Sequence, residues 1–280
     1  MELTLGITLA VLGAALLHAI WNAMVKSSRD VLLDTTIVIV GAGAAAAPLL
    51  AFVAPPAPAS WPYLAASVAI HIGYYVALVG AYRAGDLSHG YPIMRGVAPL
   101  LVALCAVAWL GETPGPAVWA GVLLICGGVL SLGLAGFHWR ESRLSTGWAL
   151  ANAVIIAAYT LVDAAGVRAS GSAEGYVLWM FVLDALPFPL MVFLLKGNQL
   201  QSYAARFWAR GLAGGVLSAL AYGIALWAMT RAPVAAVAAL RETSVVFAAL
   251  IGAFILKEGH ARRRLGGAAA VVAGIVALRL

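Results

Sequence analysis

Long apolar stretches alternate with short polar turns along the whole chain. Each stretch is close to the length of about 20 residues that a helix needs to cross a bilayer. Runs of this length lack the alternating pattern of membrane-barrel strands, so they predict an all-α membrane protein. The ten predicted transmembrane helices are residues 3–25, 31–54, 62–82, 88–110, 115–135, 146–168, 175–195, 210–230, 233–256 and 264–280.

Residues 82–112 combine a polar turn with an apolar run that contains an unusual charge. The run carries Pro92, Pro99 and Arg95, and the arginine lies on the order of 10 Å below the helix end at 1.5 Å per residue. A charge at that depth is expensive in lipid, so it should face a wet cavity or a partner. Arg95 is therefore either a residue of a transport pathway or a structural arginine that snorkels or pairs with a neighbour.

A related pattern recurs 146 positions later. The matched pairs are Arg95 and Arg241, Leu110 and Leu256, Glu112 and Glu258, Gly121 and Gly267, and Gly128 and Gly274. Charged and glycine matches at one fixed offset indicate an internal duplication, with repeats at residues 1–137 and 145–280. Because each repeat has an odd number of spans, the second is inserted upside down, which gives an inverted repeat. We expect Gly121 and Gly267 to lie at close helix contacts.

Composition supports an integral membrane protein: 64% of the 280 residues are hydrophobic, 10% are charged and the mean hydropathy is +0.98. The net charge of +6 is spread over many loops, which argues against a nucleic-acid partner. Two cysteines inside apolar spans indicate neither a disulfide nor a metal site, and we expect no cofactor. The N-terminus lacks a basic segment, so we expect a retained first helix rather than a signal peptide.

Basic residues are distributed unevenly between the two sides of the membrane. The loops after spans 1, 3, 5, 7 and 9 carry 12 lysines and arginines, whereas the opposite side carries three, namely Arg168, Arg231 and Arg279. By the positive-inside rule, both termini face the periplasm.

Polar and aromatic side chains recur at helical spacing on several spans. A single stripe of this kind fits the hydrogen bonding that holds membrane helices together, and His18 or His71 alone fits a satisfied polar contact. Several stripes in one bundle, with two buried arginines, favour a polar central cavity. The candidate substrate-binding residues are His18, Trp21, Asn22, His71, Tyr75, Tyr82, Tyr91, Arg95, Tyr159 and Tyr222. The candidates for a gate or charge pair are Asp163, Arg241 and Glu242.

The segments HAIWNAMVK, AYRAGDLSHGYPIMRGVAPL with the LGE turn that follows, and YTLVDAAGVR resemble the EamA family of the drug/metabolite transporter superfamily. The closest likeness is to its bacterial YddG-type amino-acid exporters, and it extends over nearly the whole chain. This resemblance implies ten helices in two inverted five-helix repeats, a central cavity and a multi-pass location in the bacterial inner membrane. Many family members are thought to have cytoplasmic termini, which conflicts with the loop charge and leaves the orientation open.

We therefore expect a secondary transporter that exports amphipathic metabolites, foremost amino acids with aromatic or other apolar side chains. A zwitterion needs a cation for its carboxylate, for which Arg95 and Arg241 are candidates. It also needs an acceptor for its ammonium, for which Asp163 and Glu242 are candidates. Packing against the rings of Trp21, Tyr75 and Tyr159 would hold the side chain.

Other function classes fit less well. The sequence has no Walker A motif for ATP-driven transport, and neither H-E-x-x-H nor G-x-S-x-G for an enzyme. A passive channel and an exporter of drugs, nucleosides or other metabolites remain as alternatives. We expect the protein to work as a monomer in the bilayer.

The inverted repeat also predicts a gate. Asp163 and Arg241 should share a level near the periplasmic end, where they either pair when that mouth closes or form a permanent brace. Arg95, at the cytoplasmic level, should lack a matching acid within the helices and rely on Asn22, His18 or a tyrosine.

Overall fold

The computed structural model describes residues 2–84, 87–134, 143–254 and 261–280, and these contain helices but no strand. Side chains are described outside residues 79, 81–89, 133–143 and 251–265. The helices are α1 (Leu5–Lys26), α2 (Val31–Ala46), α3 (Trp61–Ala84), α4 (Leu87–Leu110), α5 (Pro116–Leu134), α6 (Arg143–Ala169), α7 (Ala173–Asp184), α8 (Pro187–Met229), α9 (Val234–Arg241), α10 (Ser244–Phe254) and α11 (Ala261–Ala277), with short 3-10 helices η1 (Ala47–Phe52) and η2 (Pro58–Ser60).

The helices follow the ranges of the predicted spans. Within the described residues, five segments are long and apolar enough to cross a membrane, and two shorter helices are apolar. The five are Leu5–Lys26, Val31–Phe52, Gly90–Leu110, Leu144–Ala169 and Ala173–Met229, and the shorter two are Pro116–Leu132 and Gly266–Ala277. The chain is thus a multi-pass membrane protein, and the number of ten spans stays a prediction.

Two of the predicted spans, 175–195 and 233–256, are interrupted rather than continuous. α8 begins at Pro187, because proline lacks a backbone donor and suits the first position of a helix. α9 ends at Arg241, where Thr243 Oγ1 donates to the Leu240 carbonyl at 2.7 Å and competes with the helical pattern. The second break leaves Glu242 in a turn, which is tolerated at membrane depth where protein surrounds it.

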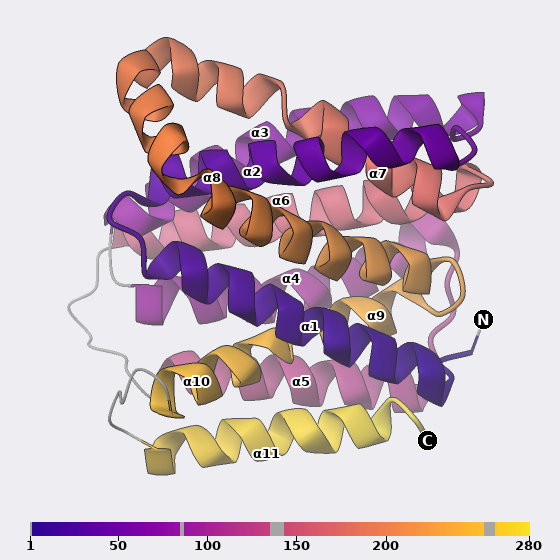
Figure 1. Cartoon of the computed structure of the whole chain (residues 1–280). Helices are drawn as coiled ribbons and strands as arrows, with labels where there is room; N and C mark the ends of the chain where they lie inside the picture. The colour runs from indigo at the N-terminus through magenta and orange to yellow at the C-terminus, as the bar shows by residue number, and fades with distance from the viewer. Residues whose placement is uncertain (1, 85–86, 135–142, 255–260) are drawn as a thin grey trace.

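α8 is too long for one straight crossing, since its 43 residues would extend about 65 Å at 1.5 Å per residue. Its backbone leaves helical geometry at Lys196 (φ −137°, ψ 25°) and at Phe207 (φ −120°, ψ 19°). The stretch between these bends reverses the direction of the chain at one end of the bundle, and the helix then runs back along α1 (Figure 1).

α5 and α11 lie side by side (Figure 1), and glycines of both helices form the contact between them. A Cβ at Gly121 would lie 2.9 Å from the Gly274 carbonyl oxygen, and a Cβ at Gly128 would lie 2.7 Å from that of Gly267. Gly121 thus lies opposite Gly274, the repeat counterpart of Gly128, and Gly128 lies opposite Gly267, the repeat counterpart of Gly121. Such a self-complementary contact is typical of a two-fold axis, here within one chain. The prediction that Gly121 and Gly267 lie at close helix contacts is confirmed.

Equivalent helices of the two repeats surround the centre of the bundle. α6 packs against α3 and α4, and α1 packs against α8, α9 and α10. Both termini lie at one end of the bundle, and the turn between α1 and α2 lies at the other (Figure 1). Which end faces the cytoplasm stays a prediction from loop charge.

Candidate transport site

A small cavity of about 10 Å³ lies among α1, α3, α4 and α6. This volume holds about one water molecule, so this cavity is too small for a metabolite in this conformation. The lining residues are His18, Asn22, Tyr74, Leu78, Tyr91, Met94, Arg95, Asn152 and Ile156. Four of the predicted substrate-binding residues, His18, Asn22, Tyr91 and Arg95, are thus brought to one space.

Arg95 forms a buried ion pair across the bundle. Its Nε lies 2.7 Å from Glu242 Oε2, although the two groups are not aligned as a hydrogen bond, and the side chains are only 5% and 4% exposed. Its Nη2 also donates to Ser244 Oγ at 3.4 Å. The expectation that Arg95 lacks a matching acid within the helices is wrong, because the break between α9 and α10 brings Glu242 against α4.

Asp163 is held by two tyrosine hydroxyls. Tyr222 Oη donates to Asp163 Oδ2 at 2.6 Å, and Tyr176 Oη donates to Oδ1 at 3.0 Å. The Arg241 guanidinium lies 4.7 Å from the centre of the Tyr222 ring. Tyr222 therefore links Asp163 to Arg241, and the ion pairs of the described residues include none between these two. Direct pairing in another conformation stays a prediction.

The other predicted aromatic residues cluster around His71. The ring centres of Tyr159, Tyr75 and Tyr222 lie 4.6, 6.3 and 6.3 Å from that of His71. His71 Nδ1 is 3.1 Å from Asp184 Oδ2, and both side chains are buried. Sequence reasoning missed Asp184, which lies at the end of α7, within a stretch that was predicted to be one continuous helix.

Trp21 and Asn152 also have buried polar atoms without hydrogen-bond partners in the described part of the chain. Trp21 packs edge-on against His18 with ring centres 5.2 Å apart, and its Nε1 has no partner. Asn152 donates to Met94 Sδ at 3.0 Å, while its Oδ1 has no partner. Asn152 was not among the predicted site residues, although its place on a polar stripe of α6 is a signal for it. The side chain of Tyr82 lies outside the described residues.

Glu112 and Arg168 tie the helices together at the end that carries the termini. Arg168 Nη2 lies 2.7 Å from Glu112 Oε1, and Arg168 Nε donates to the Met229 carbonyl at 2.8 Å. The Glu112 carboxylate also accepts from the Val234 backbone at 3.0 Å, at a helix start that favours negative charge. These contacts join α4, α6 and the α8–α9 turn. Sequence reasoning noted Glu112 only as a repeat match, and its counterpart Glu258 lies outside the described residues.

Comparison with known proteins agrees with this architecture. No curated protein is similar enough to count as a match. A solved structure, titled only as the crystal structure of a protein, is 22% identical with a TM-score of 0.77, and the alignment covers 98% of this chain and 98% of that chain. At this identity the likeness shows the fold. The model of the EamA-like transporter family matches twice, over residues 4–134 and 144–280. The chain therefore belongs to the EamA-like transporter family, whose members are membrane transporters and not enzymes.

Proposed function

We propose that this protein is a secondary transporter that exports small amphipathic zwitterions across the bacterial inner membrane. Its foremost substrates are amino acids with aromatic or other apolar side chains. The observation that carries the proposal is the buried ion pair of Arg95 and Glu242, because Arg95 also lines the central cavity.

The charge balance of this pair favours a zwitterion. Separating two buried charges is unfavourable unless each gains a new partner. A substrate carboxylate at Arg95 and a substrate ammonium at Glu242 supply both partners and leave the net charge of the site unchanged. A cationic drug would leave the guanidinium uncompensated, and an uncharged sugar offers neither group.

The surroundings suit an apolar side chain beside these charges. Tyr74 and Tyr91 line the cavity, and Tyr159 packs beside Tyr74 with ring centres 5.7 Å apart. Aromatic faces bind apolar and aromatic groups well. Within the described residues, Oδ1 of the cavity-lining Asn152 has no hydrogen-bond partner, and it adds an acceptor for a polar ligand.

Alternating access fits a cavity this small and the predicted inverted repeat. In transporters of this kind the two ends open in turn around one central site. The contacts of Glu112 with Arg168 and Val234 hold the end with the termini together. Arg95 lies in the first repeat and Glu242 in the second, so one chain supplies both charges of the candidate site, and we propose that the monomer is functional.

A resistance screen tests the proposal. In a bacterial strain sensitive to toxic aromatic amino-acid analogues, overexpression should raise the inhibitory concentration several-fold. Arg95→Gln should abolish this protection, whereas Arg231→Gln, the same change at an exposed arginine in a turn, should keep it. Protection against cationic dyes or nucleoside analogues, with none against amino-acid analogues, would favour the drug or nucleoside exporter instead.

A further inference from the structure

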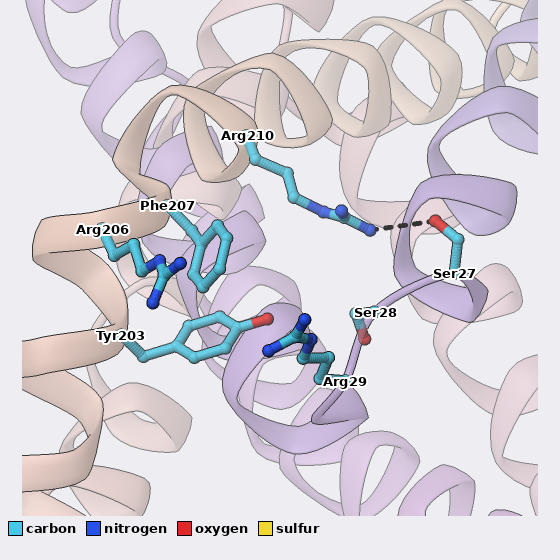
Figure 2. Close-up of a pocket in the computed structure, with 7 residues that line it drawn as sticks. All are labelled: Ser27, Ser28, Arg29, Tyr203, Arg206, Phe207 and Arg210. Carbon is cyan, nitrogen blue, oxygen red and sulfur yellow. Dashed lines mark hydrogen bonds between the residues drawn. The ribbon is translucent and has the colours of Figure 1, made fainter.

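A second pocket, of about 220 Å³, lies at the end of the bundle opposite the termini, between the α1–α2 turn and α8 (Figure 2). It shares no lining residue with the central cavity. The pocket is lined by Ser27, Ser28, Arg29, Tyr203, Arg206, Phe207 and Arg210.

The pocket carries a surplus of positive charge. Three lining arginines contribute +3, and the one carboxylate paired with them, Asp34 at 3.3 Å from Arg210 Nε, contributes −1, which leaves +2. Arg29 and Arg206 are exposed, and within the described part of the chain neither has a carboxylate at ion-pair distance. The Arg206 guanidinium lies 5.5 Å from the centre of the Phe207 ring. Because this ring is uncharged, the contact leaves the positive charge of Arg206 uncompensated.

One wall of the pocket is fixed in place. Arg210 donates to Ser27 Oγ at 3.1 Å and to the Met24 carbonyl, in addition to its pair with Asp34. Tyr203 Oη donates to Asp34 Oδ1 at 3.0 Å, and Asp34 is fully buried. Figure 2 shows the side chains of Arg210, Arg29 and Tyr203 converging on the space between the turn and the helix.

Ser28, in the α1–α2 turn, also lines the pocket. Its Oγ is buried and has no hydrogen-bond partner within the described residues. Buried hydroxyls normally have a partner. A hydroxyl beside guanidinium groups matches the acceptor oxygens of a phosphate, which arginine binds with two parallel hydrogen bonds.

α8 exposes large apolar side chains next to the pocket and before its first bend. Trp208 is 66% exposed beside the lining residue Phe207, and Leu194 and Leu195 are 75% and 74% exposed just before the first bend. Tryptophan is typical of the membrane interface, and basic pockets between membrane helices bind anionic headgroups. We propose that this pocket binds the phosphate of an anionic ligand, with a phospholipid headgroup favoured over soluble phosphate as its source.

Thermal unfolding of the purified full-length protein in uncharged detergent tests the proposal. Added phosphatidylglycerol should raise the melting temperature by about 2–4 °C, whereas phosphatidylcholine, whose phosphate is balanced by its own choline, should not. Arg29→Gln combined with Arg206→Gln should remove this rise, and Arg231→Gln should retain it. Each variant is compared with its own lipid-free sample, so an effect of the substitution on folding cancels. At 0.5 M salt the rise should shrink, because charges in an open pocket are screened.

The outcomes separate the sources. If inorganic phosphate at millimolar concentration stabilises the wild type but not the double variant, and the lipid does not, the phosphate site stands and its ligand is soluble. If neither phosphatidylglycerol nor phosphate stabilises the wild type, or if the double variant responds as the wild type does, the proposal is overturned. Because the test measures no transport, its result does not depend on the proposed substrate.

Discussion

Removing one partner of the Arg95–Glu242 pair is expected to destabilise the protein strongly. Glu242→Gln keeps the size of the side chain but leaves the Arg95 guanidinium, 5% exposed, without its carboxylate. Breaking a buried pair from one side costs about 3–5 kcal/mol. For a domain of roughly this size each kcal/mol lowers the melting temperature by about 2–4 °C. Glu242→Gln should therefore melt about 6–20 °C below the wild type.

A double variant distinguishes a stability effect from a transport effect. Arg95→Met combined with Glu242→Met removes both charges, and apolar replacement of a whole buried pair is often neutral for stability. The double variant should recover most of the lost melting temperature while transport stays abolished, because no cation remains for the substrate carboxylate.

Fluorescence-detected thermal unfolding in detergent provides the measurement. Glu2→Gln, the same change at an exposed residue near the N-terminus, is the control and should shift the melting temperature by less than about 2 °C. A shift equally small for Glu242→Gln would refute the reasoning. So would a double variant that is less stable than either single variant.

Three further predictions follow from the packing, the closed end and the loop charge. Gly128→Leu should lower folded yield, since a side chain there meets the neighbouring helix backbone, whereas Gly127→Leu next to it, with nothing within 4 Å, should not; equal yields would argue against the contact. Glu112→Gln should loosen the end tied by Arg168 and speed the reaction of a cysteine placed at Tyr159 with a hydrophilic thiol reagent, in a background without native cysteines, and unchanged labelling would contradict this role. A C-terminal alkaline phosphatase fusion should be active and a GFP fusion dark, and the reverse pattern would overturn the periplasmic assignment.

The helix ranges could be predicted because the thickness of the bilayer sets the length of each apolar stretch. The glycine contacts could be predicted because two helix backbones approach closely only where the residues between them are small. The break after Arg241 could not, since neither Glu242 nor Thr243 is a proline or glycine, and the short polar run Arg241–Ser244 lies between two apolar stretches that together have the length of one span. That break decides which acid reaches Arg95. Likewise, the contact of His71 with a carboxylate depends on how α7 is rotated against α3, which periodicity within one helix does not reveal.

Counterflow in proteoliposomes tests the central claim, that the site moves zwitterions, most directly. Liposomes that contain the purified protein and unlabelled phenylalanine should accumulate external labelled phenylalanine, with a rate that saturates. Phenethylamine lacks the carboxylate and phenylpropionate lacks the ammonium, so each leaves one member of the Arg95–Glu242 pair uncompensated and should not drive exchange. Saturable exchange of phenylalanine that neither analogue supports is the predicted result. A flux that rises linearly with concentration, or equal exchange of all three compounds, would contradict the claim.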